Sequence, residues 1–167
     1  ITVKYAMTLD GKISSKSGNS SWISNKHSRN IVHKLRSQSD AVLIGINTLL
    51  TDNPRLNARN GFSGPRFRVV LDSNSKTPKD SNLFEAPGKI LIYTTSTNPP
   101  NQTNNNVEYV KVNPSEKGVD ISTVLEDLAN RGCINIFVEG GKDILGSFFD
   151  LNLVNKVIIF ISPKIVS

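Results

Sequence analysis

The sequence predicts an α/β protein of three layers, with a mostly parallel central sheet and helices on both faces. Short apolar runs rich in β-branched residues alternate with segments whose apolar residues recur at helical spacing. The most informative stretch is a strand-like run from Ile134 to Glu139, the pair Gly140-Gly141, and a helical pattern reaching Phe149. A strand that enters a helix through glycines presents free backbone N–H groups at the helix start, where phosphate binds favourably. An ordinary strand–helix turn is the alternative interpretation of this stretch.

The other elements follow in order along the chain. The segments typical of strands are residues 1–7, 40–45, 67–71, 89–93, 107–112, 134–139 and 156–161. Helices are expected from the cap Ser24 to about Ser37, over residues 46–50, from the cap Asp120 to the stop at Gly132, and after Gly141. The second helix must end near Pro54, because the residue before a proline disfavours helix. Residues 53–65 are expected to form a basic loop.

Composition favours one domain with an anionic small-molecule ligand. The 167 residues carry a formal net charge of +6, and four of the seven arginines fall between Arg55 and Arg68. The charge forms no long block and no aromatic–basic pattern that stacks bases, which argues against a nucleic-acid-binding domain. Cys133 is the only cysteine, so the chain can form neither an internal disulfide nor a cysteine zinc site, and a reducing compartment is expected. No run reaches membrane-spanning length. Because the chain starts at Ile1 within a predicted strand, it is expected to be part of a longer polypeptide.

Motifs for several enzyme classes are absent from the sequence. His27 and His33 lie six residues apart on one predicted helix, and therefore on different faces, so both are expected to be solvated. There is no nucleophile elbow, no Walker loop and no dinucleotide fingerprint of three spaced glycines; Gly146 after Gly140-Gly141 is a looser arrangement. Hydrolases and nucleotide triphosphatases are thereby disfavoured.

Polar or basic residues gather where strands are expected to end. The segments that share this property are residues 4–12, 20–22, 48–59, 72–76 and 139–147. Since parallel strands end at one edge of a sheet, these segments are expected to line one elongated cleft. Such a cleft would hold a long anionic ligand and a second, smaller one.

The sequence also resembles the reductase domain of the riboflavin-biosynthesis deaminase–reductase family, over essentially its whole length. The segments that carry the resemblance are residues 6–12 (AMTLDGK), 17–23 (SGNSSWI), 33–36 (HKLR), 45–56 (GINTLLTDNPRL), 70–73 (VLDS), 138–141 (VEGG) and 162–164 (SPK). The resemblance implies a dihydrofolate-reductase-like fold over residues 1–167. It also implies reduction of 5-amino-6-(5-phosphoribosylamino)uracil by NADPH, with hydride transfer to ribose C1′ of the ring-opened substrate.

The resemblance also implies roles for individual residues. The cofactor would lie against Ala6, Trp22, Thr48, Asp52, Ser73, Gly141, Lys142, Asp143, Ile144, Leu145, Gly146 and Ser147. The substrate would lie against Ser20, Arg36, Leu56, Arg59 and Glu139, with Lys4 and Glu139 as catalytic residues. Arginines suit a 5′-phosphate because they bind it through two parallel hydrogen bonds, and Ser73 with the nearby Lys76 would meet the 2′-phosphate of NADPH. Alternatively, Arg36 complements its helix dipole, Trp22 is a core residue and Asp52 ends a helix.

The same resemblance implies a homodimer, no metal, and a cytoplasmic or, in a plant-type source, plastid location. In the family an N-terminal zinc deaminase with His-x-Glu and Cys-x-x-Cys elements is usual; neither element occurs in this chain, which therefore should not deaminate. Another reductase of this fold, such as a dihydrofolate reductase, is an alternative, although Arg36 and Arg59 favour a phosphorylated substrate. A non-catalytic nucleotide-binding module is the other alternative.

Overall fold

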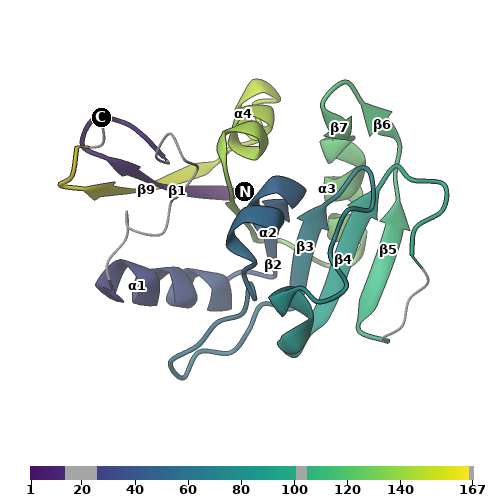
Figure 1. Ribbon diagram of the computed structural model, residues 1–167, viewed down its shortest axis with the longest axis horizontal. Coiled ribbons are helices and arrows are strands. Elements are labelled where there is room, and N and C mark those ends of the chain that lie inside the picture. The colour runs from purple at the N-terminus through teal and green to yellow at the C-terminus, as the bar shows by residue number, and fades with distance from the viewer. Residues whose placement is uncertain (14–25, 101–104, 166–167) are drawn as a thin grey trace.

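The computed structural model describes residues 1–13, 26–100 and 105–165, and within them a seven-stranded, wholly parallel sheet forms the centre of the molecule (Figure 1). The strand order is β5-β4-β3-β2-β8-β1-β9. The strands are β1 (Thr2–Thr8), β2 (Ala41–Gly45), β3 (Phe67–Leu71), β4 (Lys89–Thr94), β5 (Val107–Lys111), β8 (Ile136–Glu139) and β9 (Lys156–Ser162). The helices are α1 (Lys26–Ser37), α2 (Ile46–Asp52), α3 (Ile121–Asn130) and α4 (Lys142–Asp150), with a 3₁₀ turn, η1 (Asn82–Glu85). Residue for residue, β3 has its predicted bounds.

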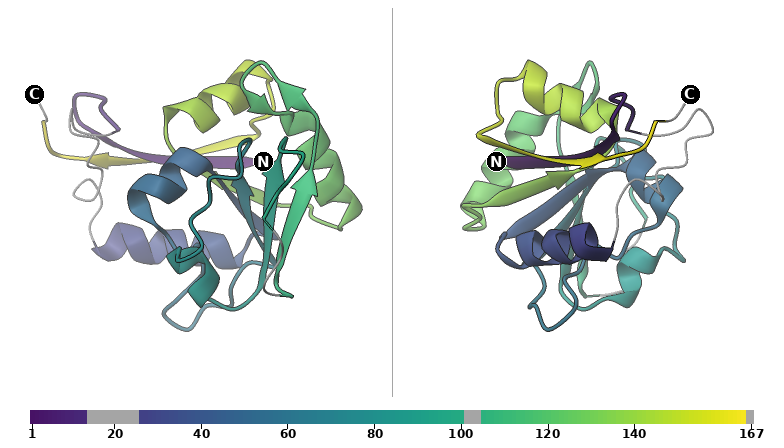
Figure 2. Two further views of the ribbon diagram at one scale, coloured as in Figure 1. Left: turned by 45° about the vertical axis from the view of Figure 1, so that its right-hand side comes forward. Right: turned by 90° about the vertical axis from the view of Figure 1, so that its left-hand side faces the viewer.

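Two apolar cores lie on opposite faces of the sheet, which makes the predicted three layers. One core packs α3 and α4 against the sheet through Val124, Leu128 and Phe148. The other packs α1 and α2 through Val32 and Leu49. Figure 2 shows α3 and α4 on one side of the strands and α1 on the other. Every residue of β2 and β3 is buried, as expected for central strands covered on both faces.

Side-chain caps fix the helix boundaries beside the strand ends. Asp120 accepts hydrogen bonds from the backbone N–H groups of Ser122 (3.3 Å) and Thr123 (3.2 Å), which confirms it as the N-cap of α3. Asn53 ends α2 in the left-handed conformation (φ 41°), and its side-chain oxygen accepts from the Ser81 hydroxyl at 2.8 Å. The predicted cap Ser24 lies outside the described residues.

A small antiparallel hairpin of β6 (Pro114–Ser115) and β7 (Gly118–Val119) stands apart from the main sheet, and no sequence pattern predicted it. Each of its strands is two residues long, too short for an alternating apolar pattern. The turn η1 was missed because its four residues are too few to show a helical repeat of apolar positions. Both elements turn out to border the functional site.

The edge formed by β1 and β9 is the least covered part of the sheet. Strand β8 stops at Glu139, which pairs with Lys4, so the rest of β1 continues beside β9 alone. In Figure 1 this pair projects away from the helices. The exposed large apolar side chains here are Leu9, Val157, Ile159, Ile161 and Ile165. None of the helices in the described residues is long and apolar enough to cross a membrane.

Candidate functional site

Two cavities open at the carboxyl ends of the central strands. The first, which we call the acidic cavity, has a volume of about 370 Å³ and lies between α2, α4 and the β6–β7 hairpin. The second, the basic cavity, has a volume of about 410 Å³ and lies between α1, β1 and the loop that follows α2. Strand β8 leads to both, because Glu139 lines the basic cavity and Gly141 lines the acidic one. The predicted single cleft is therefore two compartments that meet at one strand end.

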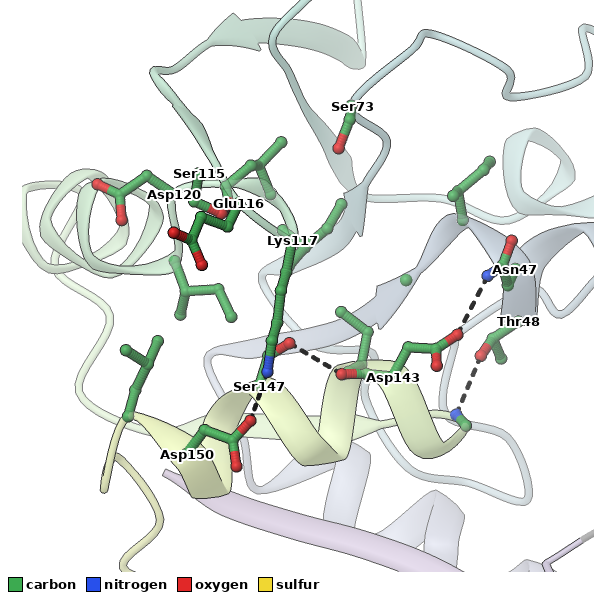
Figure 3. A pocket seen from close by; sticks show the side chains of 18 residues that line it. Asn47, Thr48, Ser73, Ser115, Glu116, Lys117, Asp120, Asp143, Ser147 and Asp150 are labelled. Atoms are coloured by element: carbon green, nitrogen blue, oxygen red, sulfur yellow. Dashed lines mark hydrogen bonds and ion pairs between the residues drawn. The ribbon is translucent and has the colours of Figure 1, made fainter.

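The acidic cavity reaches the main chain at the start of α4 (Figure 3). The Gly141 N–H donates to the Thr48 hydroxyl at 3.3 Å, and the Asn47 amide donates to Asp143 at 3.4 Å, so α2 and α4 are tied together here. A Cβ added to Gly141 would meet no atom within 4 Å. The first turn of α4 therefore faces open space with backbone N–H groups that have no partner within the helix, which is the arrangement that binds phosphate.

Ser73 lies on the opposite wall of the acidic cavity, at the end of β3. The buried Asp72 carboxylate shapes the turn by accepting from the backbone of Lys76 (2.9 Å) and Thr77 (2.8 Å). The Ser73 carbonyl accepts from the Thr95 hydroxyl at 2.9 Å, and Figure 3 shows the Ser73 side chain pointing into the cavity that it lines. Lys76, expected beside it, is exposed and does not line this cavity.

The hairpin comes close to Ser73 only because residue 118 is glycine. Gly118 has φ +126°, and a Cβ there would lie 2.6 Å from the Ser73 hydroxyl oxygen. From the same hairpin Lys117 extends along the cavity to the far end of α4, where its ammonium pairs with Asp150 at 2.5 Å (Figure 3). No sequence pattern indicated that Lys117 and Asp150, 33 residues apart, belong to the site.

Glu139 and Arg36 form the central ion pair of the basic cavity. The guanidinium donates to both carboxylate oxygens, at 2.6 Å and 3.1 Å, and donates again to the Asn57 carbonyl at 3.1 Å. Both side chains are only 12% exposed. Burial would raise the pKa of Glu139, but Arg36 and Lys4 outweigh burial and hold this pKa below its ordinary value. Glu139 is therefore an ionised carboxylate at neutral pH.

Lys4 lies opposite Glu139 in the register of β1 and β8. Burial lowers the pKa of Lys4, with Arg36 acting in the same direction and Glu139 opposing them. A lysine whose pKa is lowered gives up its proton more readily than an exposed one, so this ammonium is suited to proton transfer. The pair of catalytic residues expected from the resemblance is thus side by side in the structure, at the floor of the basic cavity.

His33 also lines the basic cavity, which corrects the expectation that both histidines are solvated. It is half-buried, and burial lowers its pKa, with Arg36 adding to this effect. Its Nδ1 is buried and has no hydrogen-bond partner in the part of the chain that the structure describes. The helical pattern missed this because His33 adjoins Val32 at the edge of the buried face of α1. His27 is exposed as expected.

A buried arginine supports the outer wall of the basic cavity. Arg68, on β3, donates to the backbone carbonyls of Arg55 (3.2 Å), Ala86 (2.7 Å) and Gly88 (3.0 Å), and burial lowers its pKa to about 10. It thereby anchors the basic loop to the sheet. On that loop the Arg55 guanidinium pairs with Glu85, whereas Arg59 is exposed and makes no ion pair with any described residue.

The structure divides the predicted site residues between the two cavities. Those that line the acidic cavity are Thr48, Ser73, Gly141, Asp143, Ile144 and Ser147. Those that line the basic cavity are Lys4, Arg36, Asp52, Arg59 and Glu139. Those that line neither are Ala6, Leu56, Lys142, Leu145 and Gly146. Leu56 and Leu145 are buried core side chains. Ser20 and Trp22 lie outside the described residues.

Residues that sequence reasoning missed complete both cavities. In the basic cavity they are Arg29, His33 and Arg55; in the acidic cavity they are Ser115, Glu116, Lys117, Asp120 and Asp150. Arg55 lies in residues 48–59, which were expected to line the cleft, His33 lies in one of the segments that carry the resemblance, and Asp120 was predicted only as a helix cap; nothing in the sequence pointed to the others. The described ranges hold no group of three or more His, Cys, Asp and Glu side chains placed to bind a metal ion.

Residues 1–166 match the family model described as the RibD C-terminal domain. The riboflavin biosynthesis protein RibD of Chlamydia trachomatis is 33% identical over 171 residues, covering 98% of this chain and 46% of that protein. The chloroplastic protein PYRR of Arabidopsis thaliana is 36% identical over 172 residues, covering 98% of this chain and 28% of that protein. The chain therefore spans about half the length, or less, of these curated relatives.

Two solved structures are similar over 99% of this chain. One is a deaminase/5-amino-6-(5-phosphoribosylamino)uracil reductase of Thermotoga maritima, 33% identical with a TM-score of 0.86, of which this chain covers 45%. The other is the riboflavin biosynthesis reductase Rib7 of Saccharomyces cerevisiae, 26% identical with a TM-score of 0.80, of which this chain covers 74%. The predicted dihydrofolate-reductase-like α/β fold is confirmed by these structures and by the parallel sheet.

Proposed function

The chain belongs to the RibD C-terminal domain family of riboflavin-biosynthesis reductases, and from that premise we propose that it reduces 5-amino-6-(5-phosphoribosylamino)uracil to the 5-phosphoribitylamino product. We propose NADPH as the reductant. The observation that carries the proposal is that the end of β8 opens into both cavities. Glu139 faces the basic cavity and Gly141, two residues later, faces the acidic one. A ligand in each cavity would meet at this strand end.

The acidic cavity fits a dinucleotide phosphate by its main chain. The start of α4 offers N–H groups, Gly141 leaves room for close approach, and the Ser73 hydroxyl is directed at the cavity from the opposite wall. When bound, the reduced nicotinamide supplies the hydride, and the protein supplies orientation. Thr48 and Asn47 hold α2 and α4 at a fixed separation, so the cavity walls are preorganised for such a ligand.

The basic cavity fits the phosphorylated pyrimidine. Arg59 is exposed, makes no ion pair with a described residue, and is a natural partner for the 5′-phosphate. Adding hydride to C1′ of the ring-opened imine requires one proton on the adjacent nitrogen. Lys4 is the proposed source of that proton, and the negative charge of Glu139 favours the cationic form of Lys4 before transfer. The balance is one hydride and one proton added across one C=N bond.

We further propose that this oxidoreductase forms a homodimer. We also propose that it works in the cytoplasm or in a plastid. The exposed apolar side chains of β9 support the dimer, because isolated edge strands of this kind expose unpaired backbone groups and apolar surface. Light scattering on the purified protein measures its mass directly. A monomer at micromolar concentration would contradict the dimer and leave the proposed reaction unaffected.

Absorbance of the reduced nicotinamide tests the reaction. We expect NADPH oxidation with the phosphoribosylamino-pyrimidine and none with dihydrofolate. Oxidation with dihydrofolate alone would establish the alternative reductase. Tight NADPH binding with no oxidation by either substrate would instead indicate a non-catalytic nucleotide-binding module.

A further inference from the structure

Among the described residues that line the acidic cavity, Lys117 is the only one with a positive side chain. Its charged neighbours there are Glu116, Asp120, Asp143 and Asp150, all negative. The wall is therefore net negative even though a phosphate-bearing ligand is proposed for it. A phosphate near these carboxylates, beyond the reach of the α4 helix start, would be repelled unless Lys117 contacted it.

Lys117 can exchange its present partner, Asp150, for another anion. Its pairing with Asp150 leaves the two side chains 63% and 62% exposed. Ion pairs this exposed are held weakly, since water solvates both charges nearly as well when they separate. Asp150 also raises the pKa of Lys117, so the side chain stays cationic at every pH at which the protein would work.

Lys117 is attached next to the point where the hairpin meets Ser73. Its neighbour Gly118 lies so close to the Ser73 hydroxyl that a Cβ would come within 2.6 Å of it. The lysine side chain has four rotatable bonds and is attached beside Gly118, so a rotamer that releases Asp150 would bring the ammonium to the side of the cavity where Ser73 lies. A hydroxyl donor and a cation can thus face the same phosphate.

We propose that Lys117 is the residue that makes this cavity select a ribose 2′-phosphate over a free 2′-hydroxyl, and that it does so by exchanging Asp150 for the phosphate. The proposal rests on the proposed function, because it concerns the same nicotinamide cofactor. A phosphate monoester carries about −1.5 to −2 charges at neutral pH, so it attracts the ammonium more strongly than one carboxylate does. Without Lys117, the surrounding carboxylates would repel that phosphate but could accept a hydrogen bond from a 2′-hydroxyl.

The test is the dissociation constant of NADPH and of NADH, each measured by nicotinamide fluorescence without substrate. For Lys117→Met we expect NADPH binding to weaken about tenfold or more, because one charge-assisted contact is lost, while NADH binding changes less than about twofold. For Asp150→Asn we expect the opposite sign, tighter NADPH binding, because the competing carboxylate is gone. Lys117→Arg should keep the preference for NADPH.

The matched control is Lys89→Met, which removes the same charge from an exposed lysine at the amino end of β4. It should leave both constants unchanged. Equal weakening of NADPH and NADH in Lys117→Met would overturn the inference, and so would loss of the NADPH preference in Lys76→Met but not in Lys117→Met. Failure of the unaltered protein to bind either nucleotide would refute the proposed cofactor instead, so the two failures are distinguishable.

Discussion

The two cavities offer different kinds of group to a negatively charged ligand. The basic cavity does so with side chains, placing Lys4 and Arg36 beside one buried carboxylate and the exposed Arg59 elsewhere in its lining. The acidic cavity does so with main chain, at the start of α4, and its side chains are mostly carboxylates. Helix N–H groups bind phosphate by geometry and close approach, whereas guanidinium groups bind it by charge and reach. A glycine is thus as important to one cavity as an arginine is to the other.

The difference also shows in how firmly each charge is held. Arg36 and Glu139 are nearly buried and hydrogen-bonded to each other at both carboxylate oxygens, so neither can leave without great cost. Lys117 and Asp150 are largely exposed and make a single contact. The first pair is a permanent part of the basic cavity, and the second is free to rearrange. Substitutions in the two cavities should therefore have different kinds of effect.

The largest expected effect is on cofactor binding in Gly141→Val. The backbone of Gly141 (φ −79°) suits any residue and a Cβ there meets nothing within 4 Å, so the protein should fold normally. The added methyl groups would occupy the space into which the α4 N–H groups point, so measurable NADPH affinity should be lost in a fluorescence titration. Gly64→Val, also without a neighbour within 4 Å, is the matched control and should bind normally. Unimpaired affinity in Gly141→Val would refute the main-chain phosphate site.

The second-largest expected effect is a loss of folding stability in the Glu139→Gln variant. The amide keeps the shape of the side chain but leaves Arg36 and Lys4 without their counter-charge in a buried setting, which should cost about 3–5 kcal/mol in the free energy of unfolding. The control Glu108→Gln removes the partner of Arg131 at a more exposed site, with 37% of the glutamate side chain accessible, and should cost less than about 1 kcal/mol. Denaturant titration measures both. Equal losses would show that the basic cavity is no more rigid than the surface.

The Glu139→Gln deficit should depend on pH in one direction. The folded-state pKa of Glu139 lies below its ordinary value of 4.5, so ionised Glu139 stabilises the fold fully at pH values above 4.5. That contribution is lost as the pH falls through the folded-state pKa. The difference in unfolding free energy between the unaltered protein and Glu139→Gln should thus be constant near neutrality and shrink under acid conditions. A difference that grows on acidification would mean that burial, and not Arg36, dominates.

The smallest effect is the one on substrate recognition in Arg59→Ala. Loss of one charge-assisted phosphate contact should raise the substrate KM by the equivalent of about 1.5–3 kcal/mol and leave the NADPH KM nearly unchanged. Arg55→Ala is the comparison, because Arg55 already pairs with Glu85 and both are about half exposed. Arg55→Ala should raise the substrate KM less than Arg59→Ala does. Equal changes in the substrate and cofactor KM for Arg59→Ala would contradict the division of ligands between the cavities.

The sequence predicted what depends on local pattern. Every main-sheet strand was located, because each is an apolar run, and Asp120 was identified as a cap because it precedes an amphipathic helix. The turn at Gly140-Gly141 was recognised for the same reason. The order of the strands could not be predicted, because the position of β8 between β2 and β1 depends on pairing between segments far apart in the sequence.

The features of the site that could not be predicted from the sequence likewise depend on contacts between residues far apart in the chain. Arg36 meets Glu139 across 103 residues, and Lys117 meets Asp150 across 33. Both members of the first pair were expected in the site, but their mutual ion pair was not. Asp52 was assigned to the cofactor yet lines the basic cavity, because α2 runs from one cavity to the other. Such assignments remain predictions for binding measurements to test.

The placement of β8 has a consequence for the order in which the protein forms during synthesis. Strands β1 and β2 do not touch each other as neighbours; each pairs with β8, which is made almost a hundred residues after β2. Until β8 leaves the ribosome, β1 has no partner in the sheet and β2 through β5 form an incomplete half with one open edge. Pairings this distant in sequence form slowly. Glu139 and the start of α4 arrive together with β8, so neither cavity can be completed before this strand is made, and β9 follows to finish the sheet beside β1.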